Sequence, residues 1–122
     1  MREMFGLSDV STVATGVDVE SFTPTQPAAR SGLVFVGSMD WMPNIEGLLW
    51  FTREVLPLVR RQLPQCTLTI AGSRPSASIR ALAADCPHVR VTGTVDDIRP
   101  YLWAGGVSVV PIRIGSGTRL KI

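Results

Sequence analysis

The stretch "GLVFVGS" at residues 32–38 decides the fold. It is a short apolar run, rich in Val and Phe, that ends in glycine, as the buried strands of parallel sheets do. In the segment "NIEGLLWFTREVLPLVRRQL" at 44–63, apolar side chains recur at spacings of three and four, which predicts a helix with one buried face. That face contains Ile45, Leu48, Leu49, Thr52, Val55, Leu56, Val59 and Leu63. We expect Asn44 to be its N-cap and Pro57 to kink or split it.

The same alternation continues along the chain. Strands are predicted at 66–72, 89–93 and 106–112, and helices at 76–85 and 96–105. Strands that alternate with helices form βαβ units with right-handed crossovers. The sequence therefore predicts an α/β fold with a Rossmann-like, doubly wound parallel sheet of about four strands with flanking helices.

The composition of the strands predicts their order. "LVFV" (33–36) and "VSVV" (107–110) are nearly continuous apolar runs, typical of central strands, whereas "TLTI" (67–70) alternates and "VRV" (89–91) carries a charge. This favours the order 3-2-1-4, which leaves the central-type fourth strand at an open edge. We therefore expect an incomplete sheet in a piece of a longer protein. Residues 1–31 would be an interdomain linker leading into a partial Rossmann-like domain at 32–122.

Composition limits the classes of function. The chain has 122 residues, of which 45% are hydrophobic, and its net charge of +2 comes from scattered Lys and Arg, which gives little support for nucleic-acid binding. No apolar stretch approaches the roughly 18 residues of a membrane span, and no signal peptide is evident. Cys66, Cys86 and His88 do not have metal-ligand spacing, so we expect no metal and two reduced thiols.

Glycines follow the predicted strands at Gly37, Gly72 and Gly93, and after a short extension at Gly115. All would lie at the carboxyl edge of the sheet, where ligands bind at the reversal of strand order between strands 1 and 4. Glycine lets a ligand approach the backbone closely, although each glycine could also serve only a tight turn.

The tail "GSGTRLK" (115–121) places two glycines before Thr118, a candidate N-cap. Such a loop presents backbone N–H groups to an anion, and Arg119 and Lys121 in the first turn would oppose the helix dipole unless a phosphate lies there. Surface charge is the alternative. The loop matches neither GxxxxGK[ST] nor GxGxxG.

Other polar and aromatic residues have weaker signals. Asp40 could serve a ligand or a turn, Asp96 and Asp97 are predicted helix caps, and Trp41 could line a sugar pocket or simply pack.

Several pieces together resemble one family: "ATGVDVESFTP", "FVGSMDWMPNIEGLLWF", "LPQCTLTIAGSRP", "VRVTGTVDDIRPYL" and "VSVVPIRIGSGTRLKI". From about residue 11 to the end, the chain is similar to the donor-binding half of GT-B glycosyltransferases of the retaining family 4 type, also called group 1. Several similar members are exopolysaccharide sugar transferases.

The resemblance implies a nucleotide-sugar donor, no metal or other cofactor, and an active site between two Rossmann-like domains. The acceptor domain would precede residue 1, and the fragment alone would be inactive. Gly37 and Ser38 would approach the diphosphate, Gly72 and Ser73 the ribose, and Gly93 to Val95 the base. The transferred sugar and its phosphate would face Gly115, Ser116, Gly117 and Thr118, with Arg119 or Lys121 as a phosphate ligand.

The sequence departs from the family pattern at several positions. Where many members have an Arg and a Lys, this chain has Ser38 and Asn44, and Ser116 replaces the first of two glutamates. The second glutamate would fall just past Ile122, so the catalytic residues are unknown.

The acceptor could be a glycan, a lipid-linked sugar or a small molecule. The expected location is the cytoplasm, with the inner membrane surface and peripheral membrane association as a variant. A nucleotide-sugar epimerase of the same fold, a receiver or flavodoxin-like module, and a degenerate pseudoenzyme stay open as alternatives.

Overall fold

A parallel sheet of four strands forms the centre of the molecule. The structure is a computed structural model that describes residues 6, 11, 13, 14, 16–24 and 30–115. The sheet has the order β3-β2-β1-β4, and every neighbouring pair is parallel. The strands are β1 (Ser31–Val36), β2 (Leu68–Ala71), β3 (Val89–Gly93) and β4 (Gly105–Ser108). The predicted fold class and the predicted order 3-2-1-4 are confirmed.

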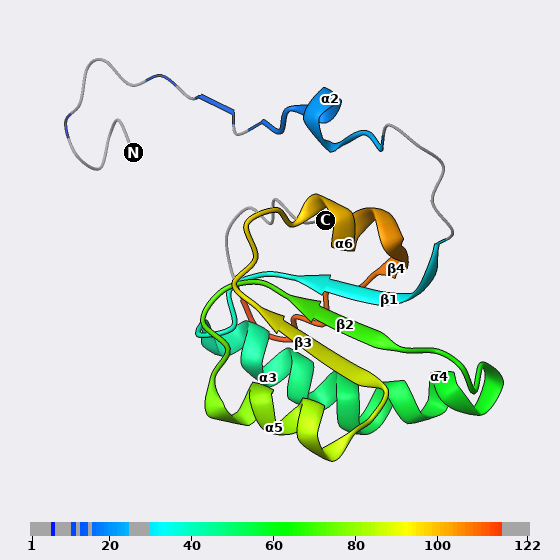
Figure 1. Ribbon diagram of the computed structural model, residues 1–122. Helices are drawn as coiled ribbons and strands as arrows, with labels where there is room; N and C mark the ends of the chain where they lie inside the picture. The colour runs from blue at the N-terminus through cyan, green and yellow to red at the C-terminus, as the bar shows by residue number, and fades with distance from the viewer. Residues whose placement is uncertain (1–5, 7–10, 12, 15, 25–29, 116–122) are drawn as a thin grey trace.

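Helices cover both faces of this sheet (Figure 1). One face carries α3 (Met42–Trp50), its continuation through η1 (Phe51–Val55) and α4 (Leu56–Gln62), and α5 (Ala77–Asp85). The opposite face carries α6 (Arg99–Ala104), and the short helix α2 (Val19–Phe22) lies beyond it. This is the arrangement that right-handed βαβ crossovers produce.

The core lies between the sheet and α3 and α5. The buried side chains that form it are Phe35, Met39, Leu48, Phe51, Leu56, Leu68, Ile70, Ile79, Leu82 and Val89. Full burial of such a side chain contributes about 1.5–3 kcal/mol, so this layer holds the sheet against its helices. The residues that alternate with these core positions are Thr67 just before β2, Thr69 on β2 and Arg90 on β3, and they line a hollow under α6. The alternation in the sequence of these strands therefore reflects one apolar and one polar face.

The start of α3 differs from the prediction. Trp41, and not Asn44, occupies the N-cap position, and its side chain makes no capping hydrogen bond. Asn44 is only 2% exposed, and its Nδ2 donates to the carbonyl oxygen of Ser38 at 2.7 Å. A buried amide must find partners, so Asn44 ties the first turn of α3 to the loop that follows β1.

The predicted disturbance at Pro57 is present as a π-helical turn. The N–H of Leu56 donates to the oxygen of Phe51, five residues back, instead of four. Pro57 then stands in the first turn of α4, where its missing N–H costs nothing. Most of the predicted helix face is buried or half-buried, but Leu63, just past the end of α4, is 62% exposed.

The fourth strand is shorter than predicted, and it is not covered on both faces within the described part of the chain. Val107 is 56% exposed, and no described strand pairs with the outer edge of β4. After β4 the chain crosses α3 at Gly47, where an added Cβ would lie 2.1 Å from the carbonyl oxygen of Pro111. Glycine at this point of α3 is therefore a requirement of packing.

The N-terminal segment is fastened to α6. Arg99 donates from Nη1 to the oxygen of Ser21 at 3.2 Å, and Trp103 donates from Nε1 to the oxygen of Phe22 at 2.8 Å. The predicted N-cap at Asp97 is wrong, because Ile98 occupies the N-cap position of α6 and makes no side-chain capping bond. Asp97, one residue earlier, accepts from the N–H of Arg99 at 2.9 Å and pairs with its guanidinium. The described residues 11, 13, 14 and 16, which precede this segment, form neither helix nor strand.

Candidate functional site

The tips of β1 and β2 meet at the carboxyl edge of the sheet. Gly37 donates its N–H to the oxygen of Ala71 at 3.1 Å, and Met39 donates to the oxygen of Ser73 at 2.9 Å. At Gly72, whose φ is +145°, a Cβ would lie 2.1 Å from the oxygen of Gly37. The two loops can approach this closely only because glycine stands there. Four predicted site residues, Gly37, Ser38, Gly72 and Ser73, are thus brought together.

The tip of β3 adjoins them. Gly93 is the last residue of β3, and it pairs with Ala71 across a shift in register between Ile70 and Ala71. Its φ of +74° turns the chain away from the strand, and Val95 in the following loop is half-buried. A hollow of about 290 Å³ lies beside this tip, lined by Gly93, Pro75 and Arg80 among others.

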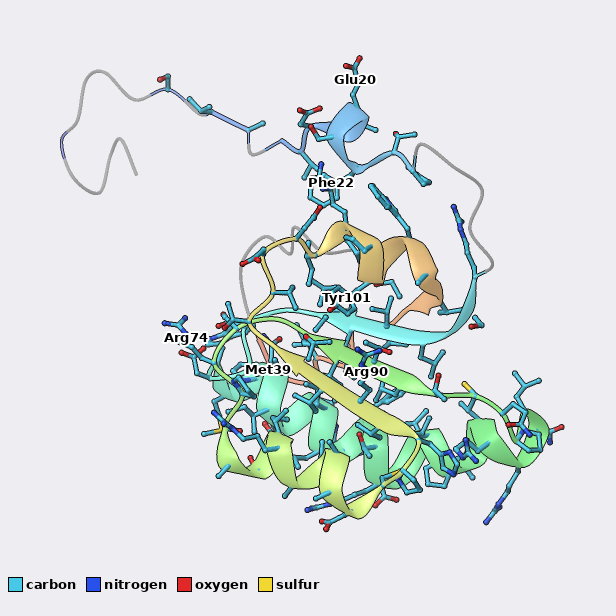
Figure 2. All side chains as sticks on the ribbon, viewed as in Figure 1. Glu20, Phe22, Met39, Arg74, Arg90 and Tyr101 are labelled. Atoms are coloured by element: carbon cyan, nitrogen blue, oxygen red, sulfur yellow. The ribbon has the colours of Figure 1, made fainter. Side chains whose placement is uncertain are left out.

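An ion-paired cluster lies on the loops after β1 and β2. Asp40 accepts a hydrogen bond from the Ser38 hydroxyl at 2.6 Å and forms a salt bridge to Nε of Arg74 at 2.8 Å. Arg74 also donates from Nη2 to the Ser38 hydroxyl oxygen at 3.3 Å. Figure 2 shows Arg74 at the carboxyl edge, where the strands end. The cluster places a guanidinium, a hydroxyl and a carboxylate beside the tip glycines.

The charge of Asp40 is stabilised within this cluster. The hydrogen bond from Ser38, and after it the positive charge of Arg74, holds the pKa of the Asp40 carboxyl below its ordinary value. Asp40 is therefore ionised at neutral pH, and Arg74 neutralises a negative charge that would otherwise repel an anion here.

Arg74 has an unusual backbone. Its φ is +51°, and it is the one residue other than glycine with a positive φ in the part of the chain that the structure describes. A left-handed conformation costs a residue with a Cβ about 1–2 kcal/mol. Such strain is concentrated at functional sites, where the surrounding structure imposes it.

The predicted loop after β4 is only partly described. Gly115 is exposed, at the end of a segment that packs on α3 through Pro111 and places Arg113 over the ring of Trp50 at 5.2 Å. The predicted binding residues Ser116, Gly117, Thr118, Arg119 and Lys121 lie outside the described residues.

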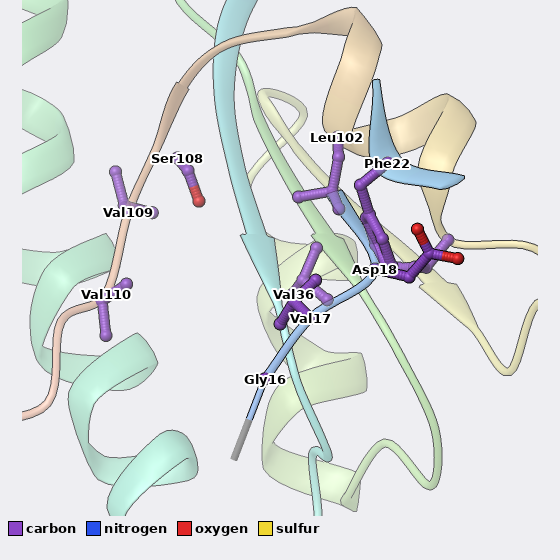
Figure 3. A pocket seen from close by; sticks show the side chains of 10 residues that line it. Gly16, Val17, Asp18, Phe22, Val36, Leu102, Ser108, Val109 and Val110 are labelled. Carbon is purple, nitrogen blue, oxygen red and sulfur yellow. The ribbon is translucent and has the colours of Figure 1, made fainter. Parts of the chain in front are cut away.

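A cavity of about 640 Å³ opens where the strand order reverses, between β1 and β4 (Figure 3). Val36 at the end of β1 and Val109 and Val110 after β4 line one side. Val17 and Phe22 from the N-terminal segment line the other. The volume suits a ligand, and the position is the one expected for a doubly wound sheet. The lining is mainly apolar, and its one ionisable group, Asp18, caps α2 through Ser21.

Phosphate chemistry therefore fits the strand tips better than the cavity. The residues lining the cavity include no Lys or Arg, whereas Arg74 lies at the tips of β1 and β2. The cavity and the strand tips adjoin at the end of β1, where Val36 lines the cavity and the next residue, Gly37, begins the tip. A ligand with an anionic and a less polar part could occupy both.

Sequence reasoning missed Arg74 and the part played by residues 16–22. "GSRP" (72–75) has a glycine before the arginine, but no pattern shows that the loop folds back on Ser38. The docking of residues 16–22 depends on hydrogen bonds from Arg99 and Trp103 that are remote in sequence. Trp41, weighed as a sugar-pocket residue, lies 45% exposed beside the β1 tip.

The described residues contain neither a cluster of metal ligands nor a membrane-spanning helix. None of them form a group of three or more His, Cys, Asp or Glu side chains that could hold a metal ion. No described helix combines the length and the apolar character needed to cross a bilayer.

Comparisons with known proteins agree with this geometry. Residues 30–122 match a family described as "Glycosyl transferases group 1". An uncharacterized 44.6 kDa protein in the cps region of Klebsiella pneumoniae is 23% identical over 96 residues. This match covers 73% of the present chain and 25% of that relative, so the chain spans about a quarter of the relative's length. No solved structure matches significantly.

Proposed function

The chain belongs to the group 1 glycosyl transferases, and from this premise we propose that it is the donor-binding part of a retaining glycosyltransferase that uses a nucleotide-sugar. The observation that carries the proposal is the meeting of the β1 and β2 tips, with Gly72 against Gly37 and the Ser38–Asp40–Arg74 cluster beside them. Backbone and guanidinium are gathered at the edge of the sheet where nucleotides bind in this class of fold.

The donor would extend along this edge. Its diphosphate would lie near Ser38 and Ser73, and its base near Gly93, where the hollow of about 290 Å³ is found. The sugar would point toward the segment that carries Gly115. Ser116, Gly117, Thr118, Arg119 and Lys121 are proposed to complete the contacts to the sugar and its phosphate.

The chemistry asked of this half is stabilisation of a leaving group. In the transfer, the bond from the anomeric carbon to the donor phosphate breaks, and the diphosphate leaves with the electron pair. The acceptor hydroxyl oxygen bonds to that carbon, and its proton passes to the departing diphosphate. Fixed N–H donors and cations at the developing negative charge lower the barrier, and they need no metal to do so. We assign no catalytic residue to the described part of the chain.

Acceptor binding is proposed to require a second domain that these 122 residues do not contain, so the chain alone would bind donor without turnover. The match to a relative in a cps region supports synthesis of a polysaccharide or another glycoconjugate as the setting. The expected location is the cytoplasm, with contact to the inner membrane surface if the acceptor is lipid-linked.

Calorimetric titration of the 122-residue chain with UDP, GDP and ADP tests donor binding. We expect one of these nucleotides to bind, and the matching nucleoside, which lacks the diphosphate, to bind much more weakly. A folded chain, as judged by circular dichroism, that binds none of the three would refute the donor-site assignment. Product analysis of a longer protein that contains the acceptor half would separate sugar transfer from epimerisation.

A further inference from the structure

Arg74 is strained in its backbone, charged, and 71% exposed at its side chain. A salt bridge between exposed groups contributes little stability by itself. The pair with Asp40 therefore does not account for an arginine held in a left-handed backbone conformation that glycine adopts at no cost. A role toward a ligand accounts for both the residue type and its place.

We propose that Arg74 binds the diphosphate of the nucleotide-sugar donor, and that Asp40 holds this guanidinium in position until the donor displaces it. The inference rests on the function proposed above and names a residue that sequence reasoning did not assign. Ser38 stands at the usual place of an arginine in the family pattern, and the structure puts the guanidinium of Arg74 on its hydroxyl at 3.3 Å. A cation from the β2 loop thus lies at the tip of β1.

The geometry suits an exchange of anions. A guanidinium has a planar set of N–H donors that matches a phosphate as well as a carboxylate. In the structure its Nε bonds to Asp40 and its Nη2 to Ser38, both in the loop after β1, so the guanidinium is already held beside the tip of β1. The Ser38 hydroxyl, which donates to Asp40 at 2.6 Å, can turn to the phosphate at the same time.

Asp40 has two opposing effects in this arrangement. It orders the guanidinium, but its ionised carboxylate also repels a diphosphate and competes with it for Arg74. The bound diphosphate can itself orient the guanidinium, so the repulsion and competition outweigh the loss of ordering. Removal of the carboxylate should therefore strengthen donor binding, whereas removal of the guanidinium should weaken it. A purely structural ion pair between two loops predicts the same direction for both changes.

The test compares three variants by calorimetric titration with UDP, GDP, ADP and inorganic pyrophosphate. Arg74→Gly removes the guanidinium and suits the left-handed backbone, so folding is not at risk. Asp40→Asn removes the competing charge. Arg61→Gln is the matched control, because Arg61 is an exposed arginine on α4, far from the carboxyl edge.

We expect Arg74→Gly to weaken binding of the preferred nucleotide on the order of tenfold to a hundredfold, the effect of one charged hydrogen-bonding group. Asp40→Asn should strengthen it by about threefold or more, and Arg61→Gln should change it by less than about twofold. The three variants should change the binding of pyrophosphate in the same order as they change the binding of the nucleotide.

Two outcomes overturn the inference on Arg74 alone: Arg74→Gly binding as tightly as Arg61→Gln, or Asp40→Asn weakening binding as Arg74→Gly does. If the folded wild-type chain binds none of the nucleotides, the proposed donor site itself fails, and the inference fails with it.

Discussion

Replacement of Gly72 by alanine should separate the tips of β1 and β2. Two contributions to the loss of stability add at this position. The φ of +145° belongs to a region that is nearly restricted to glycine, and the new Cβ would stand 2.1 Å from the carbonyl oxygen of Gly37. The overlapping atom belongs to the backbone, so no side-chain rotation relieves it.

Gly93→Ala is a matched control for the cost of placing a residue with a Cβ at a positive φ. Gly93 also lies at a strand tip with a positive φ, +74°, but an added Cβ would meet nothing within 4 Å. Gly93→Ala should therefore cost about 1–2 kcal/mol in backbone strain. Gly72→Ala should cost about 2–5 kcal/mol, because an overlap in a packed region adds about 1–3 kcal/mol.

Urea denaturation of both variants and of the wild type measures this difference. With a slope of about 1–2 kcal/mol per molar urea, the midpoint of Gly72→Ala should lie about 1 M below that of Gly93→Ala. Equal midpoints would show that the approach of Gly72 to Gly37 contributes nothing, and the reasoning on the tips would be refuted. The same titration with nucleotides should show weaker binding for Gly72→Ala, because the loops beside Ser38 are displaced.

Three further outcomes are expected. Thr52→Val should raise the free energy of unfolding by about 1 kcal/mol in urea denaturation, because the buried Thr52 hydroxyl has no hydrogen-bond partner among the residues that the structure describes. A loss of stability would contradict this. Gly47→Ala, which usually stabilises a helix by about 1 kcal/mol, should instead lower the urea midpoint because of Pro111. Asp97→Asn should lower the melting temperature at pH 7, because hydrogen bonds from Arg99 hold the pKa of the Asp97 carboxyl below its ordinary value. The difference from the wild type should disappear as the pH falls through that lowered pKa and the carboxyl is protonated, and an unchanged difference in acid would contradict this.

The order of the sheet was accessible from sequence because the doubly wound pattern, together with the apolar content of β1, β2 and β3, leaves one arrangement, although the apolar run of β4 did not predict an exposed edge strand. Phe35 and Ile70 lie in strands whose apolar patterns differ, and those patterns reflect how many faces each strand buries. The helix caps were less accessible. Asn44 has the chemistry of an N-cap, but its amide bonds to the Ser38 carbonyl, and the N-cap position passes to Trp41. Tertiary contacts of this kind override local preference.

The candidate site could also be predicted from sequence only in part. The glycines at the strand tips could be predicted, since a parallel sheet places the carboxyl ends of its strands on one edge. Arg74 could not, because its place depends on a left-handed backbone and a fold of the loop over Ser38. Neither the left-handed backbone of Arg74 nor the folding of its loop over Ser38 can be recognised from the residue types in the sequence. The apolar cavity also needed the structure, because it is formed in part by the distant residues Val17 and Phe22.

The π-helical turn at Phe51–Val55 has a consequence for how this chain tolerates changes in length. A turn closed by a bond to the fifth residue back holds one amino acid more than the α-helical ladder needs. Deletion of a single residue there can be absorbed by tightening the turn, while Leu48 before it and Leu56 after it keep facing the sheet. An otherwise rigid connection thus has a place where the number of residues can vary without rotating either half of the helix.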